Sequence, residues 1–211
     1  MITATQFGLF FNKMEYVKMK KAVILILIFI NSLNLSGCLT TKWSSTEYDM
    51  KWEAEHTEEE LKKILECFDN MDTDTLISMF SEAVKAEYDL NVQINQALEI
   101  YGKKSVSYEK CEYYGYITMS TDYGKCTERS IYAKMHNIKT DCNEVFNISI
   151  IESVIDNKNP NELGIYKISL SDPDYGNLAI IGPVDDQDLK ILKENNQKRN
   201  GNKSSENSNA D

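Results

Sequence analysis

Ser130-Ile131-Tyr132-Ala133-Lys134-Met135-His136 alternates apolar and polar side chains with a period of two. This period is typical of a β-strand with one buried face and one accessible face. Residues 146–150 alternate in the same way, and further short strands are expected at 165–169 and 178–181. Turn-forming residues separate them at 121–124, 139–141 and 157–161. The chain from Ser105 onward therefore predicts an antiparallel meander of strands.

The stretch before these strands has a helical period. Thr57-Glu58-Glu59-Glu60 is a capping-box pattern that predicts a helix start at Thr57. Four apolar residues follow it at helical spacing: Leu61, Ile64, Leu65 and Phe68. Asp72 is expected to cap a short second helix, and a third helix is expected over about residues 91–101, ended by Gly102. This order predicts an α+β fold, with three N-terminal helices on one face of an antiparallel sheet.

Composition limits the classes of partner. The chain has 211 residues, of which 42% are apolar and 27% charged, and its formal net charge is −10. These values are ordinary for one globular domain, or at most two. Only Arg129 and Arg199 are arginines, so the chain offers few guanidinium groups for phosphates. We therefore expect no nucleic-acid partner.

The first forty residues contain the parts of an export signal. Met19-Lys20-Lys21 precedes the apolar run 22–30, which is shorter than the roughly 20 residues of a membrane-spanning helix. Leu35-Ser36-Gly37-Cys38 then resembles the lipobox of bacterial lipoproteins. In that family the thiol of Cys38 would receive a diacylglyceryl group, and the signal peptide would be cut between Gly37 and Cys38. The resemblance implies a protein anchored in the bilayer through acylated Cys38, on the extracytoplasmic face of the cell membrane.

The expected organisation has four parts. Residues 1–37 are a signal peptide whose natural start is Met19, with an uncleaved hydrophobic anchor as the alternative. Residues 38–56 are the lipidated cysteine and a flexible tether, because no apolar period runs through them. Residues 57–183 form the α+β domain. Residues 184–211 are a short polar extension and a disordered tail, because no large apolar residue follows Lys193.

Three short stretches carry a resemblance to a known family. They are Ser78-Met79-Phe80-Ser81, Gln93-Ile94-Asn95 with the following Ser107-Tyr108, and the segment 159–166, Asn-Pro-Asn-Glu-Leu-Gly-Ile-Tyr. Residues 57–170 are similar in these stretches to uncharacterised lipoproteins of low-GC Gram-positive bacteria. The order of helices and strands also resembles the nuclear transport factor 2-like fold, in which three helices cross a strongly curved sheet to form a cone. The resemblance implies this fold and membrane anchoring, and it implies no catalytic residues.

A group of residues expected on or near the strands is the candidate ligand pocket. Its members are Tyr108, Tyr114, Tyr116, Tyr132, His136, Glu152 and Tyr166. In a cone fold the concave face of the sheet forms a pocket beneath the helices, and tyrosine-rich linings suit apolar or amphipathic ligands. Alternatively, the tyrosines cover a half-exposed sheet, and Glu152 lies in water at a strand end.

No catalytic, cofactor-binding or metal-binding residues are assigned from the sequence. His56 lies in the expected tether, and His136 has no partners at metal-ligand spacing. Three acids lack the ligand spacing of a calcium loop and are expected to cap helices: Asp69, Asp72 and Asp74.

The four cysteines after Cys38 are expected to be unpaired. They are Cys67, Cys111, Cys126 and Cys142. If residues 121–122 form the tip of the first hairpin, Cys111 lies opposite residue 131 or 132 and is too far from Cys126 for a disulfide. The absence of a Cys-x-x-Cys motif argues against a zinc site or a redox dithiol.

We expect a membrane-anchored, extracytoplasmic module that is not an enzyme and needs no cofactor. Its partner would be a small apolar ligand or an extracellular protein. One alternative is a small acid–base enzyme in which Glu152 and His136 share a pocket. Another is an acidic, immunity-type protein that neutralises a basic partner.

Overall fold

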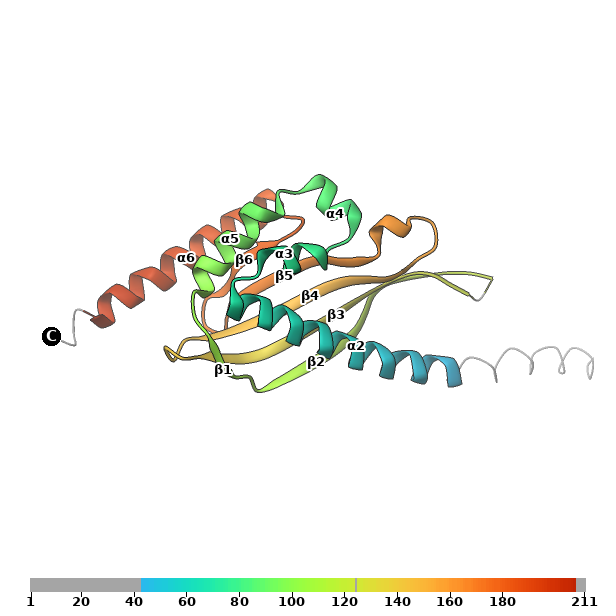
Figure 1. Ribbon diagram of the computed structural model, residues 1–211, viewed down its shortest axis with the longest axis horizontal. Helices are drawn as coiled ribbons and strands as arrows, with labels where there is room; N and C mark the ends of the chain where they lie inside the picture. The colour runs from blue at the N-terminus through green and yellow to red at the C-terminus, as the bar shows by residue number, and fades with distance from the viewer. Residues whose placement is uncertain (1–42, 124, 208–211) are drawn as a thin grey trace, which may run out of the picture. The chain divides into compact units, whose positions relative to one another are not determined.

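Six antiparallel strands follow the N-terminal helices, as the period of two predicts (Figure 1). The computed structural model describes residues 43–123 and 125–207. The strands are β1 (Ser105–Ser107), β2 (Lys110–Asp122), β3 (Lys125–Thr140), β4 (Val145–Asp156), β5 (Gly164–Asp172) and β6 (Gly176–Ile181). Their order is β1-β3-β4-β5-β6, and β2 also pairs with β3. The α+β class is therefore confirmed.

The alternation along β3 defines the two faces of the sheet. Ile131, Ala133 and Met135 are fully or almost fully buried and belong to the side on which the helices pack. Tyr132 and His136 point to the opposite side, which we call the outer face, and are only partly buried. The register places Glu152 of β4 opposite Ile131, and hence on the helix-covered side.

Five α-helices and a short 3-10 helix, Pro160–Glu162, accompany the sheet among the described residues. The α-helices are α2 (Trp43–Asn70), α3 (Thr73–Ser78), α4 (Glu82–Glu87), α5 (Leu90–Tyr101) and α6 (Asp186–Asn207). Asp72 caps α3 by accepting a hydrogen bond from the backbone N–H of Thr75 at 3.0 Å. Gly102 ends α5 with a φ of 51°, a left-handed conformation that suits glycine. Both boundaries are confirmed, whereas α4 is an additional helix, capped by Ser81.

Helix α2 differs from the sequence-based expectation because it does not begin at Thr57. The helix is continuous through this residue, which is buried and donates its hydroxyl hydrogen to the backbone oxygen of Glu53 at 2.8 Å. The chain has two compact units, and the boundary between them falls between Asp49 and Met50. The contacts described here belong to the second unit, Met50–Asp211. Residues 50–56, expected in a flexible tether, are helical because their inward-facing polar groups find partners on the sheet.

Helix α6 differs from the expected disordered tail. Asn195 and Asn196 donate side-chain hydrogen bonds to the backbone oxygens of Asn177 and Leu178 in the edge strand β6, at 2.9 and 2.8 Å. Arg199 lies 4.9 Å from the ring centroid of Phe146 and forms ion pairs with Glu144 of the β3–β4 turn and Asp172 of β5. Polar contacts therefore hold this helix, and composition alone did not indicate them.

The expected signal peptide, its cleavage between Gly37 and Cys38, and the lipidation of Cys38 all lie outside the described residues. Among the residues that the structure does describe, no helix is long and apolar enough to span a membrane.

Candidate functional site

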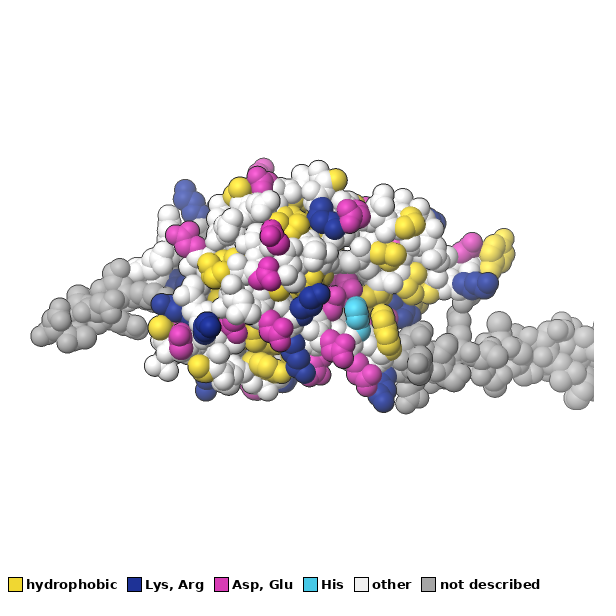
Figure 2. Space-filling model, in the orientation of Figure 1, with side chains coloured by type: hydrophobic (Ala, Val, Ile, Leu, Met, Phe, Trp, Pro, Cys, Tyr) yellow, Lys and Arg dark blue, Asp and Glu magenta, His cyan; other side chains and the backbone are white. Residues whose placement is uncertain are grey.

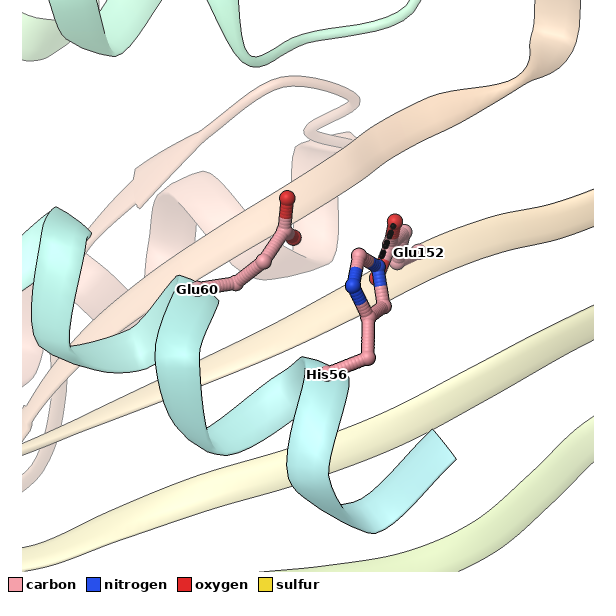
Figure 3. Close-up of side chains that lie close together, drawn as sticks. All are labelled: His56, Glu60 and Glu152. Carbon is pink, nitrogen blue, oxygen red and sulfur yellow. Dashed lines mark hydrogen bonds and ion pairs between the residues drawn. The ribbon is translucent and has the colours of Figure 1, made fainter. Parts of the chain in front are cut away.

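Three ligand-bearing side chains meet between α2 and the sheet. His56 and Glu60 are one helical turn apart on α2, so they share a face, and Glu152 reaches them from β4. Figure 3 shows the two carboxylates and the imidazole directed into the same space. His56 Nε2 and Glu152 Oε1 are 3.0 Å apart, and one ligand atom from each of the three residues lies within 4.8 Å of the others. We call these residues the α2–β4 cluster.

Burial makes negative charge on the two carboxylates of this cluster costly. Glu152 is only 6% exposed, and burial together with the nearby charge of Glu152 raises the pKa of Glu60 to about 7. The hydrogen bond to Glu152 raises the pKa of His56, although burial acts in the opposite direction. Within the described part of the chain, Oε2 of Glu60 and Oε2 of Glu152 are buried without a hydrogen-bond donor. The two carboxylates therefore need a proton or a cation between them.

A second buried group lies one turn earlier on α2. Arg129 of β3 forms an ion pair with Glu53, and the Tyr113 hydroxyl donates to the other carboxylate oxygen of Glu53. Burial is the largest cause of the raised pKa of Tyr113, followed by this hydrogen bond. Because Arg129 interacts with Glu53, its guanidinium is directed to that carboxylate, one turn away from the α2–β4 cluster.

The expected tyrosine pocket does not form as one site. His136 and Glu152 lie on opposite faces of the sheet, so the structure does not bring together the pair on which the acid–base enzyme alternative depends. On the outer face, the Tyr114 hydroxyl lies 3.0 Å from His136 Nε2, and the rings of Tyr114 and Tyr132 have centroids 5.2 Å apart. Burial is the main cause of the lowered pKa of His136.

The remaining tyrosines of the expected pocket are separated along the sheet. Tyr108 lies in the connection between β1 and β2, and it lines a hollow of about 740 Å³ that also includes Arg199 of α6. Tyr116 is exposed on β2, opposite Ile131. Tyr166 lines a different, open hollow of about 450 Å³ on the outer face, together with Ile117 and Ile151.

The four described cysteines are free, as expected. The register behind that expectation was wrong by a few residues, because the hairpin between β2 and β3 turns after Asp122. Cys111 consequently lies opposite Met135, and Cys126 lies opposite Thr121.

The sequence-based reasoning missed His56, Glu60 and Glu53. The signal for them is the apolar stripe that begins at Leu61: continued toward the N-terminus at helical spacing, it reaches Thr57 and Glu53. These positions are polar, so apolar periodicity does not indicate that the helix continues through them. The register of Glu152 under α2 had no signal in a single sequence.

Comparison with known families identifies the domain. Residues 63–173, more than half of the chain, match a family described as a domain of unknown function, DUF5104. A search of curated proteins finds no match to the chain. The matched segment contains the whole sheet up to the end of β5, including Glu152, whereas His56 and Glu60 precede it. The chain belongs to the DUF5104 family.

Proposed function

We propose that this protein is a lipid-anchored, extracytoplasmic binding module whose outer sheet face binds a protein partner. The sequence supports the anchor through the lipobox-like residues 35–38. The helices that accompany a six-stranded antiparallel sheet support the finer assignment to the nuclear transport factor 2-like cone.

The observation that carries the proposal is the apolar and aromatic character of the outer face. Tyr114 and Ile117 are each 52% exposed, and Tyr166 is 41% exposed. With the half-buried Ile151, Ile117 and Tyr166 line the hollow of about 450 Å³. Tyrosine is enriched at protein interfaces, and clustered exposed apolar groups mark interaction sites. We call this area the outer-face patch.

Acidic residues border the outer-face patch. Glu128, Asp156 and Glu162 line the same hollow. A partner with an apolar centre and basic groups around it would complement these charges. By contrast, Figure 2 shows acidic and basic side chains interspersed over the helix-bearing face, which gives the immunity-type alternative no single-sign surface there.

Site-specific photo-crosslinking in the producing cells tests the proposal. A photoreactive amino acid at Tyr166 should give a discrete crosslinked protein, whereas the same residue at Val92 should not. Val92 is a matched control because it is 50% exposed but lies on α5. The crosslinked protein, once purified, should bind the wild-type chain and lose at least about tenfold in affinity for an Ile117→Asp variant. Equal crosslinking at both positions, or a small-molecule adduct at Tyr166 without a protein, would contradict the proposal.

A further inference from the structure

The proposed function involves only the outer-face patch and gives the α2–β4 cluster no role. Glu152 is more than nine-tenths buried, and its Oε2 has no hydrogen-bond partner among the described residues although it is directed toward Glu60 and His56. The Oε2 of Glu60 is likewise buried and has no hydrogen-bond partner among the described residues. A buried carboxylate pair with unpaired oxygens is costly unless a positive charge or a proton joins it.

We infer that His56, Glu60 and Glu152 form a binding site for a divalent transition-metal ion of the Zn²⁺ type. Imidazole nitrogen and carboxylate oxygen are both ligand types that zinc accepts, and three protein ligands are the number found in zinc sites that keep a fourth position open. Calcium and magnesium sites are built from oxygen ligands, so the histidine favours zinc. The inference replaces the sequence-based expectation that the chain has no metal site.

The geometry of the cluster suits such an ion. Zinc bonds of about 2.0–2.2 Å place two ligands of a tetrahedral ion about 3.3–3.6 Å apart. His56 Nε2 and Glu152 Oε1 are already 3.0 Å apart, and the whole set lies within 4.8 Å. A shift of about 1 Å in the ligand atom of Glu60 would bring the set to the separations of a tetrahedral ion.

The surroundings of His56 position its ring for ligation. The indole of Trp52 stacks on the imidazole, with centroids 4.8 Å apart and an interplanar angle of 8°. Ligands whose orientation is fixed by neighbouring groups bind metals more tightly. Trp52 is one of the two tryptophans of the chain, so a bound ion that quenches fluorescence is expected to act on it.

Calorimetric titration of the full chain with ZnCl₂ tests the inference. We expect about one ion per chain and quenching of tryptophan fluorescence by Co²⁺. The Co²⁺ complex should lack a sulfur-to-cobalt charge-transfer band, which excludes binding by the free cysteines. His56→Gln and Glu152→Gln should each lower the affinity at least about tenfold. His136→Gln is the matched control and should leave the affinity unchanged, because this histidine lies on the outer face.

Several results would overturn the inference. They are no binding by the folded wild-type chain, a sulfur-to-cobalt band, or retention of full affinity in both variants. If Glu152→Gln fails to fold, His56→Gln and Glu60→Gln decide, because their side chains are only partly buried. For these two variants the measurement is thermal unfolding. Zn²⁺ should stabilise the wild type, and both variants should lose this stabilisation. None of these results bears on the outer-face patch, which lies on the other side of the sheet.

Discussion

At the scale of single residues, the ion pair between Glu53 and Arg129 fixes α2 on the sheet. Both side chains are almost fully buried. Removing one member of a buried pair leaves an uncompensated charge and costs about 3–5 kcal/mol. We therefore expect Arg129→Met to lower the free energy of unfolding by that amount, as measured by urea denaturation. The double variant Glu53→Met/Arg129→Met should lose less than the single variant, because no charge stays buried, and a larger loss would refute this account.

The backbone conformation and close packing at Gly182 require a glycine. Its φ is 104°, and a Cβ at this position would lie 2.4 Å from the backbone oxygen of Tyr166. Gly182→Ala is therefore expected to destabilise the fold by at least about 2 kcal/mol. Gly201 of α6 is the matched control, because nothing lies within 4 Å of its Cβ position. Gly201→Ala should stabilise the protein by up to about 1 kcal/mol in thermal unfolding, and equal effects at the two glycines would be inconsistent with the structure.

The Cys111 thiol makes the stability of the fold depend on pH. Burial, followed by the charge of Glu58, raises the pKa of Cys111 from 9.0 to about 11. Unfolding therefore favours the thiolate: the stability that Cys111 contributes is complete below about pH 9 and is lost as the pH rises toward 11. Between pH 8 and pH 11, the wild type should lose more thermal stability than Cys111→Ala. In the folded protein, iodoacetamide should label the exposed Cys142 before Cys111, and the reverse order would contradict the structure.

At the scale of elements, apolar periodicity predicted the parts of the fold that bury apolar residues. Strands β3 to β6 and helix α5 follow from it, because each presents a row of apolar side chains to the core. The beginning of α2 and most of α6 do not, because Glu53, Asn196 and Arg199 attach these helices through polar contacts. Apolar periodicity fails to predict the α2–β4 cluster for the same reason, because polar side chains form it. His56 and Glu152 meet through sheet register and helix placement, which a single sequence does not encode locally.

Helix α6 provides the test of this polar attachment. A chain ending at Val184 would lose the hydrogen bonds from Asn195 and Asn196 to β6 and the contacts of Arg199 with Phe146. At about 0.5–1.5 kcal/mol for each lost bond, we expect a loss of about 2–4 kcal/mol. Hydrogen exchange should accelerate first in β6, because its edge becomes uncovered. Unchanged stability together with unchanged exchange in β6 would show that α6 is not a structural part of the domain.

At the scale of the whole molecule, charge and anchoring act in opposite directions. Residues 38–211 contain 19 basic and 32 acidic residues, a net charge of −13. Anionic lipid headgroups repel such a domain, so electrostatic attraction does not hold it at a membrane. Each buried CH₂ of an acyl chain contributes about 0.8 kcal/mol, and two chains suffice for stable attachment. Under the proposed lipidation, the acyl chains on Cys38 therefore supply the whole membrane affinity of the mature protein.

This separation of forces makes the anchor directly testable by cell fractionation. The wild-type protein should stay in the membrane fraction through a high-salt wash and leave it in detergent, because salt screens charges and does not weaken acyl insertion. The Cys38→Ala variant should appear either as released protein or as an uncleaved precursor, whereas Cys142→Ala, the matched cysteine control, should behave as the wild type. Intact mass of the membrane-bound form should show the loss of residues 1–37 and a diacylglyceryl adduct. An unmodified Cys38 in that fraction, or an N-terminus at another residue, would exclude the anchor and with it the extracytoplasmic part of the proposed function.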